Sequence, residues 1–365
     1  MWGTRLVKIL LSTLTYSEGS SLDRKVTLAD IARESGVSQS TVSLVLRNKG
    51  GMSEDTRQRV LDTAQALGYV YSPSNQSPRR SSPNTVGLIV KVRPDDSPDT
   101  NSFYAPVLAG IEGVLRRHQV SLVYANVPVD DTNHPLELPW ILNEQDFDGL
   151  ILVGVQLDQT KLDPILETGA PLVLADAYAP DNAHDSVVSD NYAGAYQATN
   201  HLIEHGHRKI AILGSQTEGF PSILERRHGF EAAMVDHDLE PIYWDCPLRP
   251  DAVAPVFAVF KAQDPAVSGI FAANDDIAIA AIASARALGL RVPEDLSIVG
   301  FDNIAPAQHV SPALTTMRVD KIGMGRLAAQ LMLNRIDFPD SGMVRTVICP
   351  SLVRRASVMS IPPNH

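Results

Sequence analysis

From residue 86 onward, short apolar runs alternate with longer stretches of helical period, and this alternation limits the possible folds more than any other feature. The runs are four to six residues long, as in VGLIV at 86–90 and GIFAAN at 269–274. A parallel sheet covered by helices on both faces needs strands of this kind. Because the runs outnumber the strands that one open sheet comfortably holds, the sequence predicts an α/β fold with two doubly wound, parallel-sheet lobes.

Within this pattern we expect, among other elements, a helix near 135–145 and a single strand at 347–353. Ligands of doubly wound sheets bind beyond the carboxyl ends of the strands. Four polar residues lie at or directly after a strand end, so we expect them at the mouth of one cleft. A structural cap or turn is the alternative for each of them. They are Asp176, Asn274, Asp275 and Asp302.

Before the lobes, residues 26–48 (VTLADIARESGVSQSTVSLVLRN) predict two short helices joined by a tight turn. Thr27 precedes an amphipathic run and Asp30 follows it by three residues, which is the spacing of a reciprocal capping box. Gly36 ends this helix because glycine alone enters the left-handed region without cost. Ser38 caps the second helix, which completes a helix-turn-helix arrangement. The side chains that this second helix would present to a DNA major groove are Gln39, Ser40, Ser43 and Leu44.

A third helix and a polar linker come next. Ser53 is expected to cap the third helix, and its buried stripe is expected to be Val60, Leu61, Ala64 and Leu67. Residues 72–85 contain three prolines, five serines and no large apolar side chain, which is the composition of a linker. Two arginines in this linker could contact DNA phosphates, or the linker could be a solvated hinge. They are Arg79 and Arg80.

The net charge of −11 is unevenly distributed along the chain. Residues 1–85 carry 11 Lys/Arg and 7 Asp/Glu, whereas the remainder carries 20 and 35. This asymmetry suggests a basic head that faces nucleic acid and an acidic body. A mean hydropathy of −0.03 and the lack of an 18-residue apolar run argue against a membrane span.

Two features bear on the compartment. The two cysteines, Cys246 and Cys349, make no disulfide framework and fit a reducing cytosol, so we expect a cytoplasmic protein. Residues 1–25 resemble a signal peptide only faintly, because polar residues interrupt the apolar stretch and no convincing cleavage site follows. We expect this segment to be a disordered extension.

Taken together, these motifs resemble the lactose/galactose repressor (LacI/GalR) family. Residues 26–48 and the third helix are similar to the DNA-binding head of that family. SDNYAGAYQATNHLIEHGHRKIAILG, ERRHGF, FAANDD and LSIVGFDN, in this order, are similar to motifs of its body. The resemblance spans about residues 26–358. It implies a cytoplasmic homodimer that binds a two-fold related DNA operator, and a body, similar to periplasmic sugar-binding proteins, whose small effector changes operator affinity.

The resemblance also implies which residues contact DNA. Gln39 and Ser40 stand where the family most often selects its bases, and a good bidentate pair such as Gln with adenine discriminates by about 1–3 kcal/mol. Leu44 departs from a frequent Arg or His, and Arg47 from a common Asn. The full set of expected DNA contacts is Thr27, Ser38, Gln39, Ser40, Thr41, Ser43, Leu44, Arg47, Tyr71, Arg79 and Arg80.

The linker departs further from the family, in which a short hinge helix inserts a leucine wedge into the minor groove. In this chain Pro78 interrupts the segment and Arg80 stands about where the leucine would be. A proline inside a helix costs about 3 kcal/mol, so either the hinge helix is absent or arginines enter the narrow groove by electrostatics. We expect weaker DNA bending and a stronger salt dependence of binding.

In the body, the resemblance implies an effector site that contains carboxylates, a guanidinium and an amide. Such groups make paired hydrogen bonds to hydroxyls, while aromatic faces cover the apolar face of a sugar ring. We therefore expect a sugar effector, although each aromatic candidate could instead belong to a core. The expected effector-binding residues are Phe103, Tyr104, Asp176, Arg226, Trp244, Asn274, Asp275 and Asp302.

We expect a ligand-responsive repressor and not an enzyme. The chain has no P-loop, no G-x-G-x-x-G after the first strand and no G-x-S-x-G elbow. His201, His205 and His207 lie close in sequence, but no H-E-x-x-H motif is present, so neither a metal nor any other cofactor is expected. Two alternatives stay open: a regulator that responds to a non-sugar metabolite or a partner protein, and a free sugar-binding transport protein.

The expected domain organisation follows from these motifs. Closure of the lobes on the effector would shift the heads, and one head would lose its half-site. The expected segments are a disordered extension at 1–25, a helix-turn-helix domain at 26–71, a linker at 72–85, and an effector-binding and dimerisation domain at 86–365. Its N-lobe is expected at about 86–188 and 319–340, and its C-lobe at about 189–318 and 341–365.

Overall fold

The computed structural model of the chain describes residues 26–46, 53–67, 69, 85–93, 102–144, 147–180 and 184–361. The chain divides into two compact units, one on each side of the boundary between Arg79 and Arg80. We call them the head and the body. No helix among the described residues has both the length and the apolar character that crossing a membrane requires.

Within its described residues, the head contains three helices, α1 (Leu28–Ser35), α2 (Gln39–Leu46) and α3 (Glu54–Ala66). The capping box is confirmed: the Asp30 N–H donates to Thr27 Oγ1, and the Thr27 N–H donates to Asp30 Oδ2. Gly36 ends α1 with a φ of 70°, as predicted. The predicted cap of α2 is also present, because the Thr41 N–H donates to Ser38 Oγ over 3.1 Å.

One part of the predicted head core is wrong. Leu61 is 38% exposed, whereas Val60 and Ala64 are buried and Leu67 is partly buried. Successive residues of a helix are turned by about 100°, so Leu61 lies off the stripe that its neighbour Val60 occupies. The side chains that fill the core against this stripe come from α1 and α2, chiefly Ile31, Ala32, Val42 and Val45.

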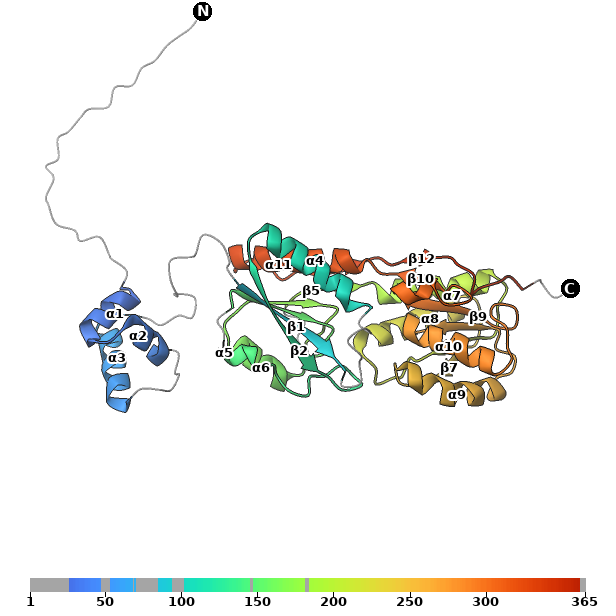
Figure 1. The fold of residues 1–365 in the computed structure, drawn as a ribbon, viewed down its shortest axis with the longest axis horizontal. Helices are drawn as coiled ribbons and strands as arrows, with labels where there is room; N and C mark the ends of the chain where they lie inside the picture. The colour runs from blue at the N-terminus through green and yellow to red at the C-terminus, as the bar shows by residue number, and fades with distance from the viewer. Residues whose placement is uncertain are drawn as a thin grey trace, which may run out of the picture. The chain divides into compact units, whose positions relative to one another are not determined.

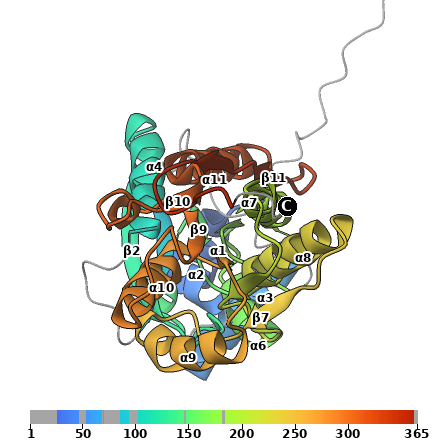
Figure 2. The same cartoon turned by 90° about the vertical axis from the view of Figure 1, so that its right-hand side faces the viewer.

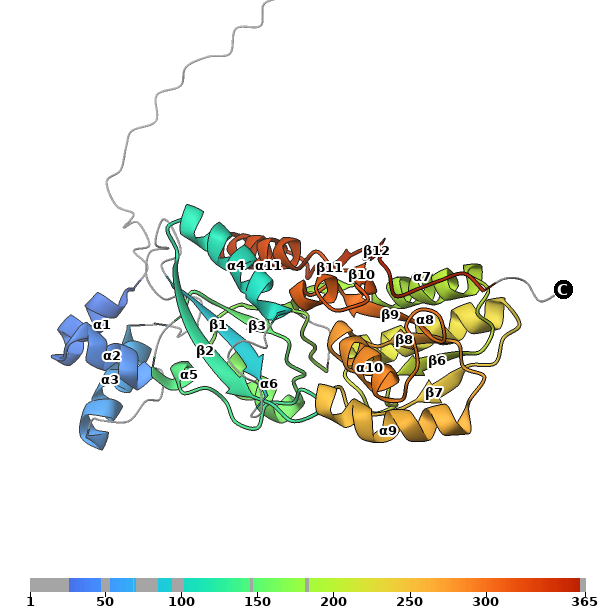
Figure 3. The same ribbon diagram turned by 45° about the vertical axis from the view of Figure 1, so that its right-hand side comes forward.

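The N-lobe of the body is a six-stranded parallel sheet in the order β11-β5-β4-β3-β1-β2. Figure 3 shows α4 and α11 side by side on one of its faces, with α5 and α6 on the other. The contact between α4 and α11 is close, because a Cβ on Gly325 would lie only 1.9 Å from the Val107 carbonyl oxygen. The strands are β1 (Thr85–Val92), β2 (Ser121–Pro128), β3 (Gly149–Val153), β4 (Leu172–Ala175), β5 (Asp185–Ser189) and β11 (Arg345–Ile348), and the helices are α4 (Tyr104–Arg117), α5 (Ile141–Glu144), α6 (Gln159–Leu166) and α11 (Lys321–Asp337).

The C-lobe repeats this architecture with the order β12-β10-β9-β8-β6-β7, in which only β12 is antiparallel to its neighbour. Its helices α7 and α8 cover one face of the sheet and α9 and α10 the other (Figures 1 and 2). The strands are β6 (Ile210–Leu213), β7 (Ile242–Trp244), β8 (Gly269–Ala272), β9 (Ser297–Asp302), β10 (Thr315–Arg318) and β12 (Ser351–Val353), and the helices are α7 (Asn191–Glu204), α8 (Pro221–Asp236), α9 (Pro250–Gln263), α10 (Asp275–Ala287) and the 3-10 helix η2 (Ala305–Gln308).

The chain passes between the lobes after β5, after β10 and after β11. The single strand predicted at 347–353 is therefore wrong: β11 belongs to the N-lobe sheet and β12 to the C-lobe sheet. Pro350 separates them, because proline has no N–H for a strand ladder and interrupts pairing. The predicted lobe boundary at 341 is wrong for the same reason, since residues 345–348 pair with β5 in the N-lobe.

Two further elements differ from the prediction. The helix expected near 135–145 is limited to α5, because Pro135 and Pro139 precede it and residues 129 and 135 form an isolated bridge instead. The apolar pattern did not reveal β10, since TTMR contains one large apolar side chain, Met317. Its burial depends on neighbouring strands and not on its own composition.

Candidate functional site

A cavity of about 140 Å³ lies where the two lobes meet, at the carboxyl ends of β1, β4, β8 and β9. Cavities of ~150 Å³ accommodate a molecule the size of one six-membered ring. The N-lobe residues that line it are Lys91, Arg93, Phe103, Tyr104, Asn133 and Asp176, and the C-lobe residues are Phe220, Ser222, Ile223, Arg226, Leu248, Asn274, Asp276 and Asp302.

Six of the eight predicted effector-binding residues meet in this cavity, although they come from distant parts of the chain. Each follows a strand end or lies in the first turns of the next helix, which is the position expected for ligand contacts in doubly wound sheets. They are Phe103, Tyr104, Asp176, Arg226, Asn274 and Asp302.

Trp244 does not line the cavity, so its predicted role is wrong. Its side chain is fully buried in the C-lobe core, where it stacks on Phe260 and meets Phe257 edge-on. The indole N–H donates to Asp264 Oδ2 over 3.2 Å, so its polar group is also satisfied within the lobe. Core packing, the alternative considered for each aromatic residue, applies here.

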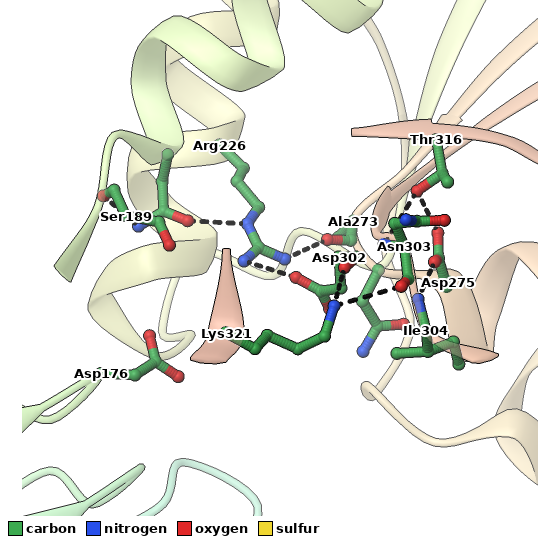
Figure 4. Close-up of polar contacts among 12 residues, drawn as sticks. Asp176, Ser189, Arg226, Ala273, Asp275, Asp302, Asn303, Ile304, Thr316 and Lys321 are labelled. Atoms are coloured by element: carbon green, nitrogen blue, oxygen red, sulfur yellow. Dashed lines mark hydrogen bonds and ion pairs between the residues drawn. The ribbon is translucent and has the colours of Figure 1, made fainter. Parts of the chain in front are cut away.

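Asp275 is also absent from the cavity lining, and its predicted role is likewise wrong. Its carboxylate accepts hydrogen bonds from the Ile304 N–H over 2.9 Å and from the Thr316 hydroxyl over 2.5 Å, inside the C-lobe (Figure 4). Asn274 caps α10 through the Ile277 N–H, and it is Asp276, one residue further, that reaches the cavity. Burial raises the pKa of Asp275 well above its usual value, with nearby Asp302 acting in the same direction.

Arg226 is the most constrained side chain of the site (Figure 4). Its guanidinium donates to Asn191 Oδ1 over 3.0 Å, to the Ala273 carbonyl over 2.6 Å and to Asp302 Oδ1 over 3.2 Å. The same planar group lies over the Phe301 ring, 3.8 Å from its centroid. These contacts fix the guanidinium in one orientation and leave one N–H on each of Nη1 and Nη2 for a ligand.

Two of the three aspartates that line the cavity, Asp176 and Asp302, are buried carboxyl groups. Burial raises the pKa of Asp176 to about 6, although Lys91 and a hydrogen bond from the Tyr104 hydroxyl (2.9 Å) oppose this shift. Burial also raises the pKa of Asp302, against the opposing charges of Arg226 and Lys321. Both aspartates have a positive φ, 47° for Asp176 and 105° for Asp302. Non-glycine residues rarely adopt this conformation and it concentrates at functional sites.

Several lining residues were not predicted. Lys91 and Arg93 lie on one face at the carboxyl end of β1, and their position after an apolar strand is the signal that could have revealed them. Lys91 Nζ donates to Asn133 Oδ1 over 2.9 Å and lies 5.4 Å from the Phe220 ring centroid. Arg93 donates to the Leu248 carbonyl of the other lobe over 2.7 Å. No sequence motif identified Asn133, Phe220 or Leu248, because their place in the cavity depends on long-range packing.

The head presents part of the predicted reading surface. Gln39 is exposed and Leu44 is 39% exposed on α2, as a helix that reads DNA requires. Ser38 and Thr41 share a hydrogen bond at the start of α2, and the exposed Thr27 hydroxyl donates to Asp30. Arg47, Tyr71, Arg79 and Arg80, and the side chains of Ser40 and Ser43, lie outside the part of the chain that the structure describes.

The three clustered histidines occupy structural positions. His205 Nδ1 lies 2.7 Å from the His201 carbonyl oxygen at the end of α7, and His207 Nε2 lies 3.3 Å from the Met359 carbonyl oxygen. Burial lowers the pKa values of His201 and His207 to about 4, so both are neutral at pH 7. Across the described residues, no three His, Cys, Asp or Glu side chains are grouped to hold a metal ion.

Comparisons with known proteins cover nearly the whole chain. A family described as "Bacterial regulatory proteins, lacI family" matches residues 27–72, and one described as "Periplasmic binding protein-like domain" matches residues 199–358. The HTH-type transcriptional repressor PurR of Aliivibrio fischeri is 32% identical over 92% of this chain and 98% of its own length. The ribose operon repressor of Haemophilus influenzae is 31% identical over 92% and 99%.

A similar fold is seen in a solved structure, the transcriptional regulator CelR–cellobiose complex. It superposes with a TM-score of 0.64 and 28% sequence identity, covering 91% of this chain and 99% of that chain.

Proposed function

This chain belongs to the lacI family of bacterial regulatory proteins, and from that premise we propose that it is a transcriptional repressor controlled by a monosaccharide bound between its two lobes. The observation that carries the proposal is the cavity between the lobes, where the fixed guanidinium of Arg226 meets Asp302 and Asp176 beside aromatic rings.

The chemistry of the lining suits a sugar ring. Carboxylate oxygens accept hydrogen bonds from vicinal hydroxyls, and guanidinium and amide N–H groups donate to hydroxyl oxygens. Phe103 and Phe220 offer apolar faces from opposite lobes. The cavity volume of about 140 Å³ favours one ring over two. The names of a relative, the ribose operon repressor, and of a similar structure, a cellobiose complex, support a carbohydrate.

The proposed mechanism is a shift between lobe arrangements. A ligand that contacts both lobes favours the lobe arrangement in which all of these contacts form together. The ligand shifts the equilibrium between two lobe arrangements only by the difference in its affinity for them. The head of each protomer in a homodimer reads one half-site of a two-fold related operator. The linkers join the heads to the N-lobes, so a change in the distance between the two N-lobes changes the spacing of the heads and alters operator affinity. Gln39 on α2 would contribute base selection.

Three further assignments belong to this proposal. The expected DNA contacts of α2 and of the linker, including Arg79 and Arg80, act on the operator. The carboxylates of Asp176 and Asp302 hold hydroxyl groups of the ligand and carry out no catalysis. The protein acts in the cytoplasm, where the DNA of a bacterial cell is accessible. The second candidate effector is a non-sugar metabolite, because similar proteins include a repressor named PurR.

The test is a thermal-denaturation screen of the full chain with D-ribose, D-glucose, cellobiose and hypoxanthine. At 100 times its dissociation constant, a ligand adds about 2.7 kcal/mol to the free energy of unfolding. We expect a monosaccharide to raise the midpoint, and Asp302→Asn to abolish the rise. Asp245→Asn is the matched control, because Asp245 also pairs with an arginine of α8 but lies outside the cavity lining.

The outcomes separate the two candidates. If hypoxanthine alone raises the midpoint of denaturation, the effector is a non-sugar metabolite and not a sugar. No rise with any of the four compounds, in a protein that still binds DNA, would contradict a small-molecule effector of either kind.

A further inference from the structure

Lys321 is the first residue of α11, a helix that packs on α4 and on the N-lobe sheet. Its side chain nevertheless reaches the C-lobe. Nζ donates to the main-chain carbonyl of Asn303 over 3.1 Å and makes a short hydrogen bond to that of Asp302 (Figure 4). Both carbonyls lie at the carboxyl end of β9, where the cavity begins. One ammonium group thus joins a helix of one lobe to the ligand edge of the other.

The segment that Lys321 holds has an uncommon backbone. Asp302 and Asn303 follow one another with φ values of 105° and 49°. Such conformations persist only where the surroundings over-determine them. Three other contacts support this turn. Thr316 Oγ1 accepts a hydrogen bond from the Asn303 N–H, and Arg355 donates one to Asn303 Oδ1 over 2.7 Å. The third is the ion pair between Arg226 and the Asp302 carboxylate. These three come from C-lobe elements, whereas Lys321 belongs to the N-lobe helix.

The surroundings of Lys321 connect it to the cavity. The side chain is buried, and its Nζ lies 5.7 Å from the ring centroid of Phe103, which lines the cavity. Lys321 itself does not line the cavity. It therefore acts on the orientation of groups that do, namely the Asp302 carboxylate and the Phe103 ring.

We propose that Lys321 is a positioning residue that couples α11 to the effector site by holding the Asp302–Asn303 turn, so that the Asp302 carboxylate faces the cavity only while α11 is in register with β9. This inference rests on the proposed function for its ligand, but not for its geometry. A movement of the N-lobe relative to the C-lobe then changes the strength of the contact between the Asp302 carboxylate and the effector.

The first experiment needs no ligand. Amide hydrogen exchange is measured by mass spectrometry on the full chain for the wild type, Lys321→Met and Lys321→Arg. Met keeps the aliphatic length without a donor, and Arg keeps a cation that can donate to two carbonyls. We expect exchange in peptides covering residues 300–306 to rise at least about tenfold in Lys321→Met and to return toward the wild-type rate in Lys321→Arg, because a charged donor to these carbonyls is lost and restored.

A matched control is available in α9. Lys261 also donates to two main-chain carbonyls, of Pro265 and Val267, and burial lowers its pKa, as burial lowers the pKa of Lys321. Lys261 does not line the cavity. Lys261→Met should leave exchange at 300–306 unchanged and affect only the end of α9. Unchanged exchange at 300–306 in Lys321→Met would overturn the proposal, as would an increase spread evenly over the C-lobe.

The second experiment measures binding with whichever of D-ribose, D-glucose or cellobiose raises the midpoint of the wild type. By titration calorimetry, Lys321→Met should raise the dissociation constant of the sugar about tenfold. Lys321→Arg should recover most of the lost affinity. Lys261→Met should bind the sugar as the wild type does. An unchanged constant in Lys321→Met would overturn the coupling. If none of the three sugars binds the wild type, the proposed sugar effector fails, while the exchange experiment still decides the role of Lys321.

Discussion

The guanidinium of Arg226 and the carboxylate of Asp302 form an ion pair at 3.2 Å, and both side chains are buried in the wall of the cavity. Breaking a buried pair by removing one partner costs about 3–5 kcal/mol, because the remaining charge is left without compensation. This pair thus links the stability of the body to the integrity of its ligand site.

Replacing Arg226 by Met should lower the free energy of unfolding at pH 7.5 by about 3 kcal/mol and abolish sugar binding. The loss should be smaller at pH 5, since Asp302, whose pKa is already raised by burial, becomes neutral more readily without the cation. Urea unfolding at the two pH values measures both effects.

The neighbouring Arg227 provides the control for this prediction. Its ion pair with Asp245 spans 3.1 Å, but the Asp245 side chain is 37% exposed. Arg227→Met should cost about 1 kcal/mol and leave sugar binding intact. Equal losses in the two variants at both pH values would contradict a special role for the buried pair.

Substitutions of Phe103 and Trp244 should have different effects, because Phe103 lines the cavity and Trp244 packs in the C-lobe core. Phe103→Ala removes an apolar wall of the cavity and should weaken sugar affinity by about tenfold with a smaller effect on the midpoint. Trp244→Phe leaves Asp264 without the indole N–H and should lower the free energy of unfolding by about 1–3 kcal/mol with affinity preserved. Calorimetric titration measures the affinity of both variants for the sugar, and thermal unfolding measures their stability. A loss of sugar affinity in Trp244→Phe would show that Trp244 contributes to the effector site after all.

Asp176 should make the stability of the body depend on pH. Its pKa is about 6 in the folded protein against 3.8 as the ordinary value, so between these pH values the folded state binds more protons than the unfolded state. The contribution of Asp176 to the free energy of unfolding is therefore largest below pH 4. It decreases by up to about 3 kcal/mol as the pH rises to 6. Asp176→Asn should remove this decline.

The measurement is the difference between the urea-unfolding free energies of Asp176→Asn and the wild type, taken from pH 4 to pH 7. Taking the difference cancels His201 and His207, whose lowered pKa values make stability fall toward acid pH. A difference that is flat with pH would show that Asp176 titrates normally.

Gln39 should determine the preference at one base pair. Gln39→Ala is expected to lose about 1–3 kcal/mol of discrimination at a single position of the operator selected in vitro from random DNA. Gln58→Ala, which removes an exposed glutamine of α3 that binds Asp62, is the control and should leave the selected sequence unchanged. A uniform loss of affinity at all positions would assign Gln39 to the DNA backbone instead.

Local chemistry determined much of this protein in advance. The capping box of Thr27 and Asp30 and the glycine turn at Gly36 depend on neighbours within a few residues, so the helix-turn-helix could be predicted from them. The positions of Asp176 and Asp302 at strand ends could be predicted as well, because the end of an apolar run marks the edge of a parallel sheet where ligands bind.

Tertiary structure decided which of the candidates face the cavity. Trp244 and Asp275 satisfied the same sequence criteria as the true lining residues, but remote partners, Asp264 for one and Thr316 for the other, hold them inside the C-lobe. Lys321 lacked any local signal, since its contacts lie 18 and 19 residues away in another lobe. Local sequence marked where many of the helices and strands begin and end, but not β10, whose burial depends on neighbouring strands. The direction in which a side chain points depends on packing between segments far apart in the chain, within the C-lobe for Trp244 and Asp275 and between the lobes for Lys321.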